Sequence, residues 1–517
     1  MTLECMELLA GQWQAAGVKI FPHQLDVAQK VVEKMNGRAI LADEVGLGKT
    51  IEAGIIIWEL MLRQQASTIL ILTPASLVQQ WCEELVTKFD LKMASDPEEL
   101  GWLHEPLICV SIDKAKRDPQ RSMLIQRNWD IVIVDEAHRL KNANSQSHHL
   151  IRSLRARNLL LLSATPMQND LHELYNLVSL VRPDLFGSFR RFQNEFAIAR
   201  RVCKNPEKLK EILNQVMIRN KRNELEMNFP EREVALLPVD MSQAEKRLYD
   251  TVTELVRQEY WQRLRSRSIL LPLLTLQKEV CSSPAALLES LTKMDTLWMA
   301  GEATRLQTLA QEIESYSKAE VLLHLVQEVG QKMIVFTEYR ATQRHLYELL
   351  RRAEIEVVEY HGGLTAVERS QAIKRFADNA QILLSTECGG QGLNLQFCRH
   401  VVNYDLPWNP MRVEQRIGRV HRIGQEGTVS IYNLYAKDSM EEYVLRLLDE
   451  KINLFRKVIG ELDMIIRHFE EKRSLEARIL EIAITSKSSA EAESRLDDLG
   501  DQLMNIRKQM EERFVTS

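Results

Sequence analysis

The stretch LADEVGLGKT, residues 41–50, decides the fold of the first part of the chain. Its end matches a phosphate-binding loop, but the strict pattern G-x-x-x-x-G-K-[ST] requires a glycine where Asp43 stands. The loop follows the apolar segment RAIL and opens the helical pattern KTIEAGIIIWELML, so that backbone N–H groups and a helix N-terminus face a bound phosphate. We therefore expect Gly46, Gly48 and Lys49 to bind nucleotide phosphates.

A second motif supplies two adjacent carboxylates. The apolar run IVIV is followed directly by Asp135 and Glu136, and open α/β sheets bind ligands at the carboxyl ends of their strands. Asp135 fits the acid that holds Mg²⁺ together with the hydroxyl of Thr50, and Glu136 fits the residue that orients and polarises the attacking water. Together with Lys49, these residues predict hydrolysis of a nucleoside triphosphate with Mg²⁺.

Composition excludes several classes of protein. The chain has 517 residues, 45% hydrophobic and 27% charged, which is typical of a modular globular protein. No apolar run approaches the ~18 residues of a membrane span, and the acidic N-terminus at Glu4 and Glu7 is unlike a secretory signal. We expect a cytoplasmic, prokaryote-like protein. The seven cysteines form no C-x-x-C pair, and a net charge of -5 means that any nucleic-acid contact needs a local basic stripe.

Short apolar runs alternate with helical patterns in two regions of the chain. The runs are RAILAD, STILILTP, PLICVSI, DIVIVDE and LLLLSAT in the first region, and KMIVFTE, IEVVEYH, AQILLST, HVVNYD and TVSIYNLY in the second. Buried strands separated by helices produce this pattern in parallel α/β sheets. We predict an α/β lobe over 1–182, a helical insertion over 183–301, a second α/β lobe over 302–460 and a helical tail over 461–517.

The tail ends in a short heptad pattern. Apolar residues recur at alternating three- and four-residue spacing at Leu496, Leu499, Leu503, Ile506 and Met510. Such a segment is too short to stand alone. We expect it to dock on the body of the protein, on itself or on a protein partner.

Six segments resemble the superfamily-two helicase-like ATPases, and specifically the Swi/Snf-type motors. They are DEVGLGKT, LTPASLVQQW, DEAH, LLLSATPMQN, STECGGQGLNL and QRIGRVHRIGQ, in the order and approximate spacing of that group. The resemblance covers about Phe21 to Gly460 and accounts for Asp43, because the loop of this group begins with Asp-Glu. It implies two RecA-like lobes that close on Mg-ATP, with the compact form of the prokaryotic, RNA-polymerase-associated relatives.

The resemblance also assigns roles to single residues. It implies that Gln24 reads adenine, although a glutamine at a helix N-terminus is an ordinary alternative. Arg419 and Arg422, on a helix that also carries Arg416, match the arginine fingers that reach the γ-phosphate; a solvated basic helix face is the ordinary alternative. Trp408 matches a tryptophan that leans on DNA, and a core or interlobe tryptophan is an equal alternative.

The remaining assignments concern nucleic acid, by resemblance only. The resemblance implies that Thr73, Pro74 and Thr337 line the path of the nucleic-acid phosphate backbone. It also implies a group of residues that lie along this path or couple the nucleotide state to the nucleic acid: Ser163, Ala164, Thr165 and Gly392.

The resulting hypothesis is an ATP-dependent translocase on duplex DNA that remodels or displaces bound protein. The segments DEAHRLKN and RIGQ occur in similar motors, whereas strand-separating relatives usually lack them. Two alternatives stay open. One is a strand-separating DNA or RNA helicase, and the other is an ATP-gated subunit of a larger complex, either RNA-polymerase-associated or defence- or restriction-like, docked through the tail.

Overall fold

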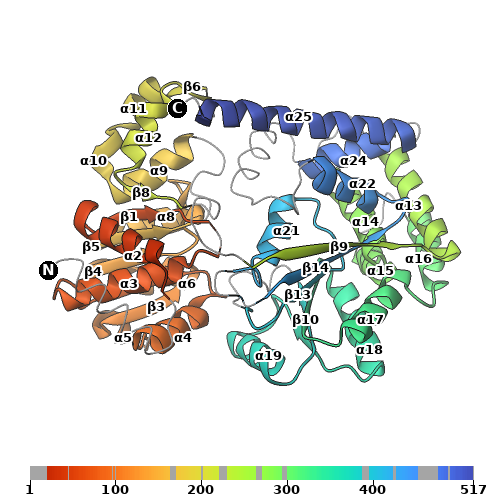
Figure 1. The fold of residues 1–517 in the computed structure, drawn as a ribbon, viewed down its shortest axis with the longest axis horizontal. Helices are drawn as coiled ribbons and strands as arrows, with labels where there is room; N and C mark the ends of the chain where they lie inside the picture. Colours follow the sequence, from red (N-terminus) through yellow and green to blue (C-terminus); the bar gives the residue numbers. More distant parts are fainter. Residues whose placement is uncertain are drawn as a thin grey trace. The chain divides into compact units, whose positions relative to one another are not determined.

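The structure is a computed structural model that contains two compact units, Met1–Asn228 and Phe229–Ser517. Each unit is built around one six-stranded sheet (Figure 1). The residues that the structure describes are 20–44, 46–95, 97–98, 100–163, 171–199, 202–220, 230–262, 270–293, 300–386, 395–422, 425, 427–451, 475–486 and 489–515. None of the described helices is long and apolar enough to cross a membrane.

All neighbouring strands of the first sheet are parallel. Their order is β3 (Leu107–Ser111), β2 (Ile69–Thr73), β4 (Asn128–Val134), β5 (Arg155–Leu162), β1 (Arg38–Leu41) and β8 (Met217–Ile218). The five predicted apolar runs form five of these strands. Because the pairing is parallel, the carboxyl ends of all six strands lie at one edge of the sheet.

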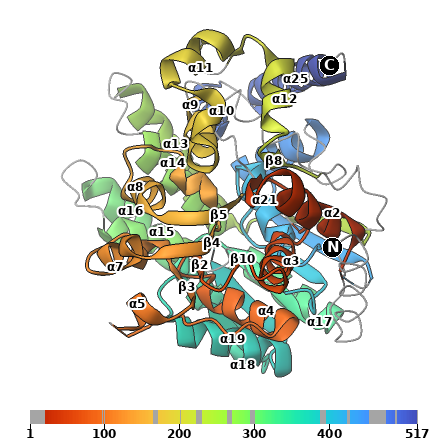
Figure 2. The same cartoon turned by 90° about the vertical axis from the view of Figure 1, so that its left-hand side faces the viewer.

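Helices cover both faces of this sheet (Figure 2). In β2, Ile69 and Ile71 pack with one layer of helices, whereas Leu70 and Leu72 pack with the other. The first layer is α2 (Pro22–Gln29), α3 (Lys49–Leu62) and α4 (Val78–Phe89), and the second contains α6 (Ile112–Ala115), α7 (Gln120–Gln126), α8 (Gln146–Ser153), α9 (Leu171–Val181), α10 (Pro183–Phe186) and α11 (Phe189–Phe196). Burial on both faces explains why the strands are continuous apolar runs rather than alternating ones.

The sheet of the second unit is also parallel throughout. Its order is β11 (Val357–Tyr360), β12 (Ile382–Thr386), β10 (Met333–Thr337), β13 (His400–Asn403), β14 (Val429–Ala436) and β9 (Arg232–Val239). One face packs on α17 (Ser317–Val329) and α18 (Arg340–Arg352), and the other packs with α19 (Ala366–Asp378), α21 (Pro410–Ile417) and α22 (Met440–Arg446). The predicted fold class, α/β with two parallel-sheet lobes, is confirmed.

The range 183–301, predicted as helical, also contains strands. Besides β8 and β9 it holds the antiparallel pair β6 (Ala197–Ala199) and β7 (Val202–Cys203). Its helices divide between the units: α10, α11 and α12 (Pro206–Leu213) belong to the first, and α13 (Gln243–Gln262), α14 (Leu270–Ser282), α15 (Pro284–Lys293) and the start of α16 (Ala300–Gln311) belong to the second. Since β8 and β9 are short or half-exposed edge strands, neither has the buried apolar run that identified the others.

The helical tail packs on its own unit. It contains α24 (Leu475–Thr485) and α25 (Ser489–Val515). Leu496, Leu499 and Leu503 of the predicted heptad are at most 5% exposed and belong to the core that also contains α22 and α24. Of the three alternatives for this segment, the structure shows docking on the body, and these leucines offer no surface to a partner.

A buried charge network joins three helices of the second unit, α14, α17 and α22, with the segment that follows β13. Lys318 of α17 lies 2.9 and 3.0 Å from the two carboxylate oxygens of Glu441 and 3.9 Å from Asp405, and it donates to the carbonyl of Cys281 at 3.1 Å. Burial acts to lower the pKa of Lys318, but the two carboxylates outweigh it and raise that pKa. Each charged side chain is nearly inaccessible to water, so the ammonium is needed to compensate both carboxylates.

Replacing the central cation tests this network. We expect Lys318→Met to lower the free energy of unfolding of the second unit by about 3 to 5 kcal/mol, because it leaves buried carboxylates uncompensated. The double variant Lys318→Met/Glu441→Gln should recover part of this loss. Scanning calorimetry measures both, and Lys246→Met is the control, because its exposed pair with Asp250 is worth less than about 1 kcal/mol. Equal losses of unfolding free energy in Lys318→Met and Lys246→Met would contradict the role of Lys318 as the compensating cation.

Candidate functional site

The phosphate loop connects β1 to α3 and depends on two glycines. Gly46 and Gly48 have φ values of +90° and +93°, in the left-handed region that favours glycine. A Cβ atom on Gly48 would also lie 2.4 Å from Nε2 of Gln24. Lys49 begins α3, and its Nζ donates to the carbonyls of Asp43 at 2.6 Å and Glu44 at 3.4 Å. The predicted phosphate-binding residues therefore lie together in one strand-loop-helix unit, where a phosphate would compete with these carbonyls for Lys49.

Gln24 holds the phosphate loop in this structure. The side chain is 2% exposed, its Nε2 donates to the carbonyl of Leu47 at 2.9 Å, and its Oε1 accepts from the backbone N–H of Phe21 at 3.0 Å. The neighbouring His23 also contacts the Leu47 carbonyl, at 3.1 Å. The predicted adenine contact would require Gln24 to exchange both hydrogen bonds, so that contact stays a prediction.

Asp43, where the strict loop pattern has glycine, is a buried anchor. Its carboxylate accepts from the backbone N–H of Asn220 at 2.9 Å and from Nδ2 of Asn220 at 2.8 Å. Glu52 of α3 and His23 lie beside it in a fully buried cluster. Burial, followed by the charge of the nearby Asp43, raises the pKa of Glu52 well above its usual range, which favours a protonated Glu52.

Asp135 and Glu136 leave the carboxyl end of β4. The Asp135 carboxylate accepts from Nε1 of Trp81 at 2.9 Å and from the backbone N–H of Glu136 at 2.8 Å. Burial, followed by the charge of Glu136, raises the pKa of Asp135 to about 6, while Lys49 acts in the opposite direction. Lys49 therefore lies close enough to affect the charge of this acid pair, and the roles of these three residues at a nucleotide stay predictions.

The backbone of Glu136 has an uncommon conformation. Its φ of +51° lies in the left-handed region, which is uncommon for a residue with a side chain and costs of order 1 kcal/mol or more. Its side chain is 40% exposed, and Oε2 lies 3.0 Å from Nδ1 of His138. A carboxylate that is oriented by a neighbour yet open to water suits the predicted role with an attacking water.

The acid pair fits a hard cation. Two adjacent carboxylates, one with its pKa raised by burial, form an oxygen donor set that favours Mg²⁺. Thr50, in the first turn of α3, has a partly accessible side chain that could add its hydroxyl. Asp135 and Thr50 thus stay the residues predicted to hold Mg²⁺, which would neutralise the phosphates and this acid pair.

In the second unit, two predicted motif residues are structural in this conformation. Thr337 at the end of β10 is buried and donates to Asp405 at 2.5 Å. Arg416 of α21 is also buried, and donates to Oδ1 of Asn403 at 3.1 Å and to the carbonyl of Asp405 at 2.6 Å. Asp405 therefore fixes the end of β10 and the helix that precedes the predicted arginine fingers.

Arg419 and Arg422 lie just past the end of α21, not on the helix that the sequence predicted. The helix ends at Ile417, and both arginines are half-buried in the following turn. Nε of Arg422 donates to the carbonyl of Gly418 at 2.8 Å, and the carbonyl of Arg419 accepts from the N–H of Leu395 at 3.1 Å. Their role at the γ-phosphate stays a prediction.

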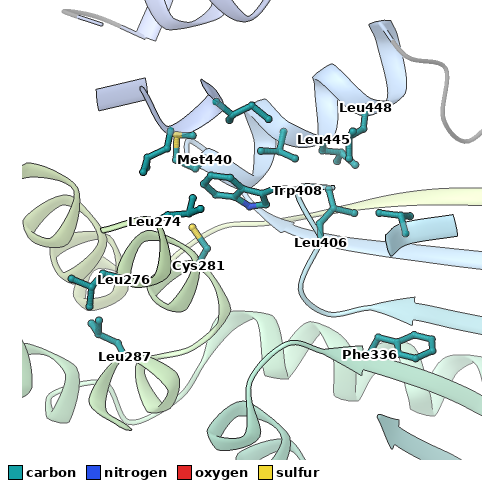
Figure 3. Close-up of a cluster of buried hydrophobic side chains, with 14 of the residues drawn as sticks. Leu274, Leu276, Cys281, Leu287, Phe336, Leu406, Trp408, Met440, Leu445 and Leu448 are labelled. Carbon is teal, nitrogen blue, oxygen red and sulfur yellow. The ribbon is translucent and has the colours of Figure 1, made fainter. Parts of the chain in front are cut away.

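Trp408 packs in the core of the second unit (Figure 3). It is 2% exposed, lies among Leu274, Met440 and Leu445, and has Nζ of Lys278 at 5.2 Å from its ring. A ring buried in this way cannot lean on DNA. The prediction of a nucleic-acid contact at Trp408 is therefore corrected to the packing alternative for this conformation.

The predicted nucleic-acid residues of the first unit lie at strand ends. Thr73 ends β2 and Pro74 follows it, both buried, and the Thr73 hydroxyl has no hydrogen-bond partner within the part of the chain that the structure describes. Ser163 follows β5, and its N–H donates to the carbonyl of Leu41 at 3.0 Å. The other three coupling candidates, Ala164, Thr165 and Gly392, lie outside the described residues.

Three positioning residues were missed from the sequence. Trp81 appears in the quoted segment LTPASLVQQW, but only the fold shows that its indole reaches Asp135. Asp405 and Asn220 carry no local signal, because their partners are 68 residues away at Thr337 and 177 residues away at Asp43.

The sequence matches known proteins over most of its length. Residues 23–286 match the SNF2-related domain, and residues 317–424 match the helicase conserved C-terminal domain. The uncharacterised ATP-dependent helicase YqhH of Bacillus subtilis (strain 168) is 43% identical over 496 residues, which cover 95% of this chain and 88% of that protein. The chain belongs to the SNF2-related family. It is therefore an ATPase, and the resemblance in the sequence motifs is confirmed.

Two further matches concern longer or more distant proteins. The RNA polymerase-associated protein RapA of Yersinia pseudotuberculosis (strain IP 31758) is 31% identical over 488 residues, which cover 84% of this chain and 50% of RapA. The chain thus spans half the length of RapA. The solved Sulfolobus solfataricus SWI2/SNF2 ATPase core in complex with dsDNA is 22% identical, with a TM-score of 0.41, and the match covers 87% of this chain and 95% of that one.

The bond between Trp81 and Asp135 can be tested by Trp81→Phe, which keeps the ring and removes the N–H donor. A hydrogen bond to a charged group is worth about 1.5 to 3 kcal/mol, so we expect ATP turnover to fall about tenfold or more. Half-maximal turnover should also need more Mg²⁺, because the carboxylate is less well oriented.

The matched control is Trp129→Phe. Trp129 is equally buried in the same unit, and its Nε1 donates at 3.1 Å to the carbonyl of Leu124, away from the acid pair. This control should lose stability but keep the Mg²⁺ dependence of the native protein. The same Mg²⁺ dependence in both variants would show that Trp81 acts only in packing.

Proposed function

We propose that this SNF2-family ATPase is a translocase that uses Mg-ATP to move along duplex DNA and to remodel or displace bound protein. The observation that carries the proposal is the gathering of Lys49, Asp135 and Glu136 at the carboxyl edge of one parallel sheet. These residues supply a phosphate-binding cation, a cation-holding acid and a solvent-accessible carboxylate, which together are the parts needed for phosphoryl transfer to water.

Each residue has a defined task in hydrolysis. The loop N–H groups and Lys49 bind the phosphates. Asp135, held by Trp81, and Thr50 would hold Mg²⁺, which supplies charge neutralisation at the phosphates. Glu136 orients the water that attacks the γ-phosphate. Arg419 and Arg422 of the second unit would stabilise the developing negative charge, a contribution worth on the order of 10³ to 10⁵ in rate for arginine fingers.

The predicted arginine fingers belong to the second unit, whereas the phosphate loop belongs to the first. ATP turnover that needs both therefore depends on how the two units are arranged. Hydrolysis that requires both sets of residues links each ATP to one cycle of closing and opening. Such a motor moves along nucleic acid if the two units bind the strand tightly at different stages of the ATP cycle. The segments DEAHRLKN and RIGQ support duplex translocation over strand separation, by resemblance to similar motors.

A second candidate is an ATPase that acts on RNA polymerase. RapA is named as RNA polymerase-associated, and this chain matches half of it. The tail gives this candidate no added support, since its heptad leucines pack on their own unit. A polymerase partner would therefore contact other surfaces.

The deciding measurement is ATP hydrolysis by the native protein and by Lys49→Ala, without nucleic acid and with single-stranded DNA, duplex DNA or RNA. We expect stimulation mainly by duplex DNA, its decline at higher salt because phosphate contacts release counterions, and its loss in the variant. Preferential stimulation by single strands or RNA would support the strand-separating alternative. Equal low activity on all nucleic acids, with stimulation by RNA polymerase, would favour the second candidate.

A further inference from the structure

Two cysteines of the first unit lie close together, and neither is assigned to ATP binding or hydrolysis. Cys82 lies in α4, directly after Trp81, and Cys109 lies in β3. Cys109 is fully buried, Cys82 is half-buried, and both are thiols in this structure. Cys82 packs against the same layer of the core that contains Cys109, so the two side chains are neighbours although they belong to different elements.

The geometry of α4 brings the two sulfur atoms to one place. The thiol of Cys109 donates to the carbonyl of Val78 at 3.8 Å, and Val78 lies one helical turn before Cys82. Side chains of an α-helix tilt toward its N-terminus, so the side chain of Cys82 extends back along the helix toward Val78. The thiol of Cys82 therefore lies on the side of α4 that Cys109 contacts.

The pair consists of one reactive thiol and one protected thiol. A hydrogen bond with Cys109 lowers the pKa of Cys82, against the opposing effects of burial and of Glu83. The same hydrogen bond, followed by burial, raises the pKa of Cys109 well above its usual range. The thiolate is the nucleophile in thiol oxidation, so Cys82 is the member that reacts first. Its partial exposure gives a small oxidant access to the sulfur.

We propose that Cys82 and Cys109 are a redox-sensitive pair, which a peroxide converts into a disulfide between α4 and β3, and that this cross-link slows ATP hydrolysis. The sulfur of Cys82 first attacks one oxygen of hydrogen peroxide. The O–O bond breaks, Cys82 becomes a sulfenic acid, and the other oxygen leaves as water with the former thiol proton. Cys109 then displaces the hydroxyl of the sulfenic acid, and this hydroxyl leaves with the proton of Cys109 as a second water. One peroxide is thus reduced to two waters while two thiols are oxidised to one disulfide.

The cross-link forms next to a contact of the ATP site. Trp81, the residue before Cys82 in α4, donates to the carboxylate of Asp135 at 2.9 Å. The charge of Asp135 also contributes to the raised pKa of Cys109, which places this thiol near the same carboxylate. A covalent bond brings two sulfur atoms closer than a hydrogen bond does and fixes their geometry, so α4 has to adjust against β3. We expect a weaker bond between Trp81 and Asp135. The inference rests on the proposed role of Asp135 in hydrolysis and is independent of movement along DNA.

The first test identifies the cross-link without an assay of activity. The reduced full chain is treated with hydrogen peroxide, alkylated and digested with trypsin. Lys88 and Lys92 lie between the two cysteines in the sequence, so trypsin leaves each cysteine on its own peptide. Mass spectrometry should then find a linked Cys82–Cys109 peptide pair that dithiothreitol separates.

Two controls belong to this test. In Cys109→Ala, which removes the second thiol, Cys82 should accumulate as the sulfenic acid and be trapped by dimedone. Cys398 is the internal control, because burial raises its pKa to about 11 and its sulfur contacts the carbonyls of Lys332 and His400. Cys398 should stay a thiol under the same treatment.

The second test compares ATP turnover before and after oxidation. We expect peroxide to lower the turnover of the native protein about tenfold, the loss expected for the hydrogen bond between Trp81 and Asp135, and dithiothreitol to restore it. Cys82→Ser should have the native rate when reduced and keep it after peroxide, which controls for oxidation elsewhere in the chain. In Trp81→Phe, which already lacks the N–H donor, oxidation should cause little further loss, because both changes act on one bond.

The outcomes separate the redox pair from the proposed function. The absence of a linked peptide, a linked peptide with unchanged turnover, equal losses in the native protein and Cys82→Ser, or losses that multiply in Trp81→Phe would each overturn the redox inference. A reduced protein that duplex DNA does not stimulate, but whose turnover without nucleic acid falls on oxidation and recovers with dithiothreitol, would sink the translocase and leave the redox pair standing.

Discussion

The site depends on parallel pairing of the strands in the first sheet. Parallel neighbours send their carboxyl ends to the same edge, so loops that are far apart in sequence meet there. The phosphate loop follows β1, Thr73 ends β2, Asp135 follows β4 and Ser163 follows β5. Had any of these strands paired antiparallel, its motif would have emerged at the opposite edge. The parallel pairing of the strands, rather than any single contact, brings the predicted ATP-site residues to one edge of the sheet.

The sequence predicted what is local or repeated, and this covers most of the fold. Ten apolar runs became ten strands, since strands buried on both faces form nearly continuous apolar runs. The phosphate loop and the acid pair were predictable because their backbone chemistry requires fixed residue types at fixed spacing, as at Gly48. The edge strand β9 escaped prediction because it is half-exposed, and its pairing with β14 joins residues about 200 positions apart.

The sequence could not predict which motif residues stabilise the protein's own fold instead of contacting a ligand. Thr337 and Trp408 match a pattern that implies ligand contacts, yet in this structure one bonds Asp405 and the other fills the core. A hydroxyl or an indole suits either role, and only burial decides between them. The same applies to Gln24, whose amide oxygen accepts from Phe21 and whose amide nitrogen donates to Leu47. A motif therefore marks where a function is built, while the fold decides which of its residues remain open to a ligand.

The buried carboxylates of the first unit divide by how their charge is compensated. Glu52 lies deep beside Asp43, and burial favours its neutral form. Asp43 accepts two hydrogen bonds from Asn220, through the backbone N–H and Nδ2. For Asp135, burial and then the charge of Glu136 raise the pKa to about 6, while the donors Trp81 and the N–H of Glu136 act in the opposite direction. A divalent cation held by Asp135 would reduce its repulsion with Glu136, the partly exposed member of the pair. The three carboxylates thus have different surroundings: burial favours the neutral form of Glu52, Asp43 anchors Asn220, and Asp135 stays the residue predicted to hold Mg²⁺. The difference follows from burial and hydrogen-bond donors rather than from residue type.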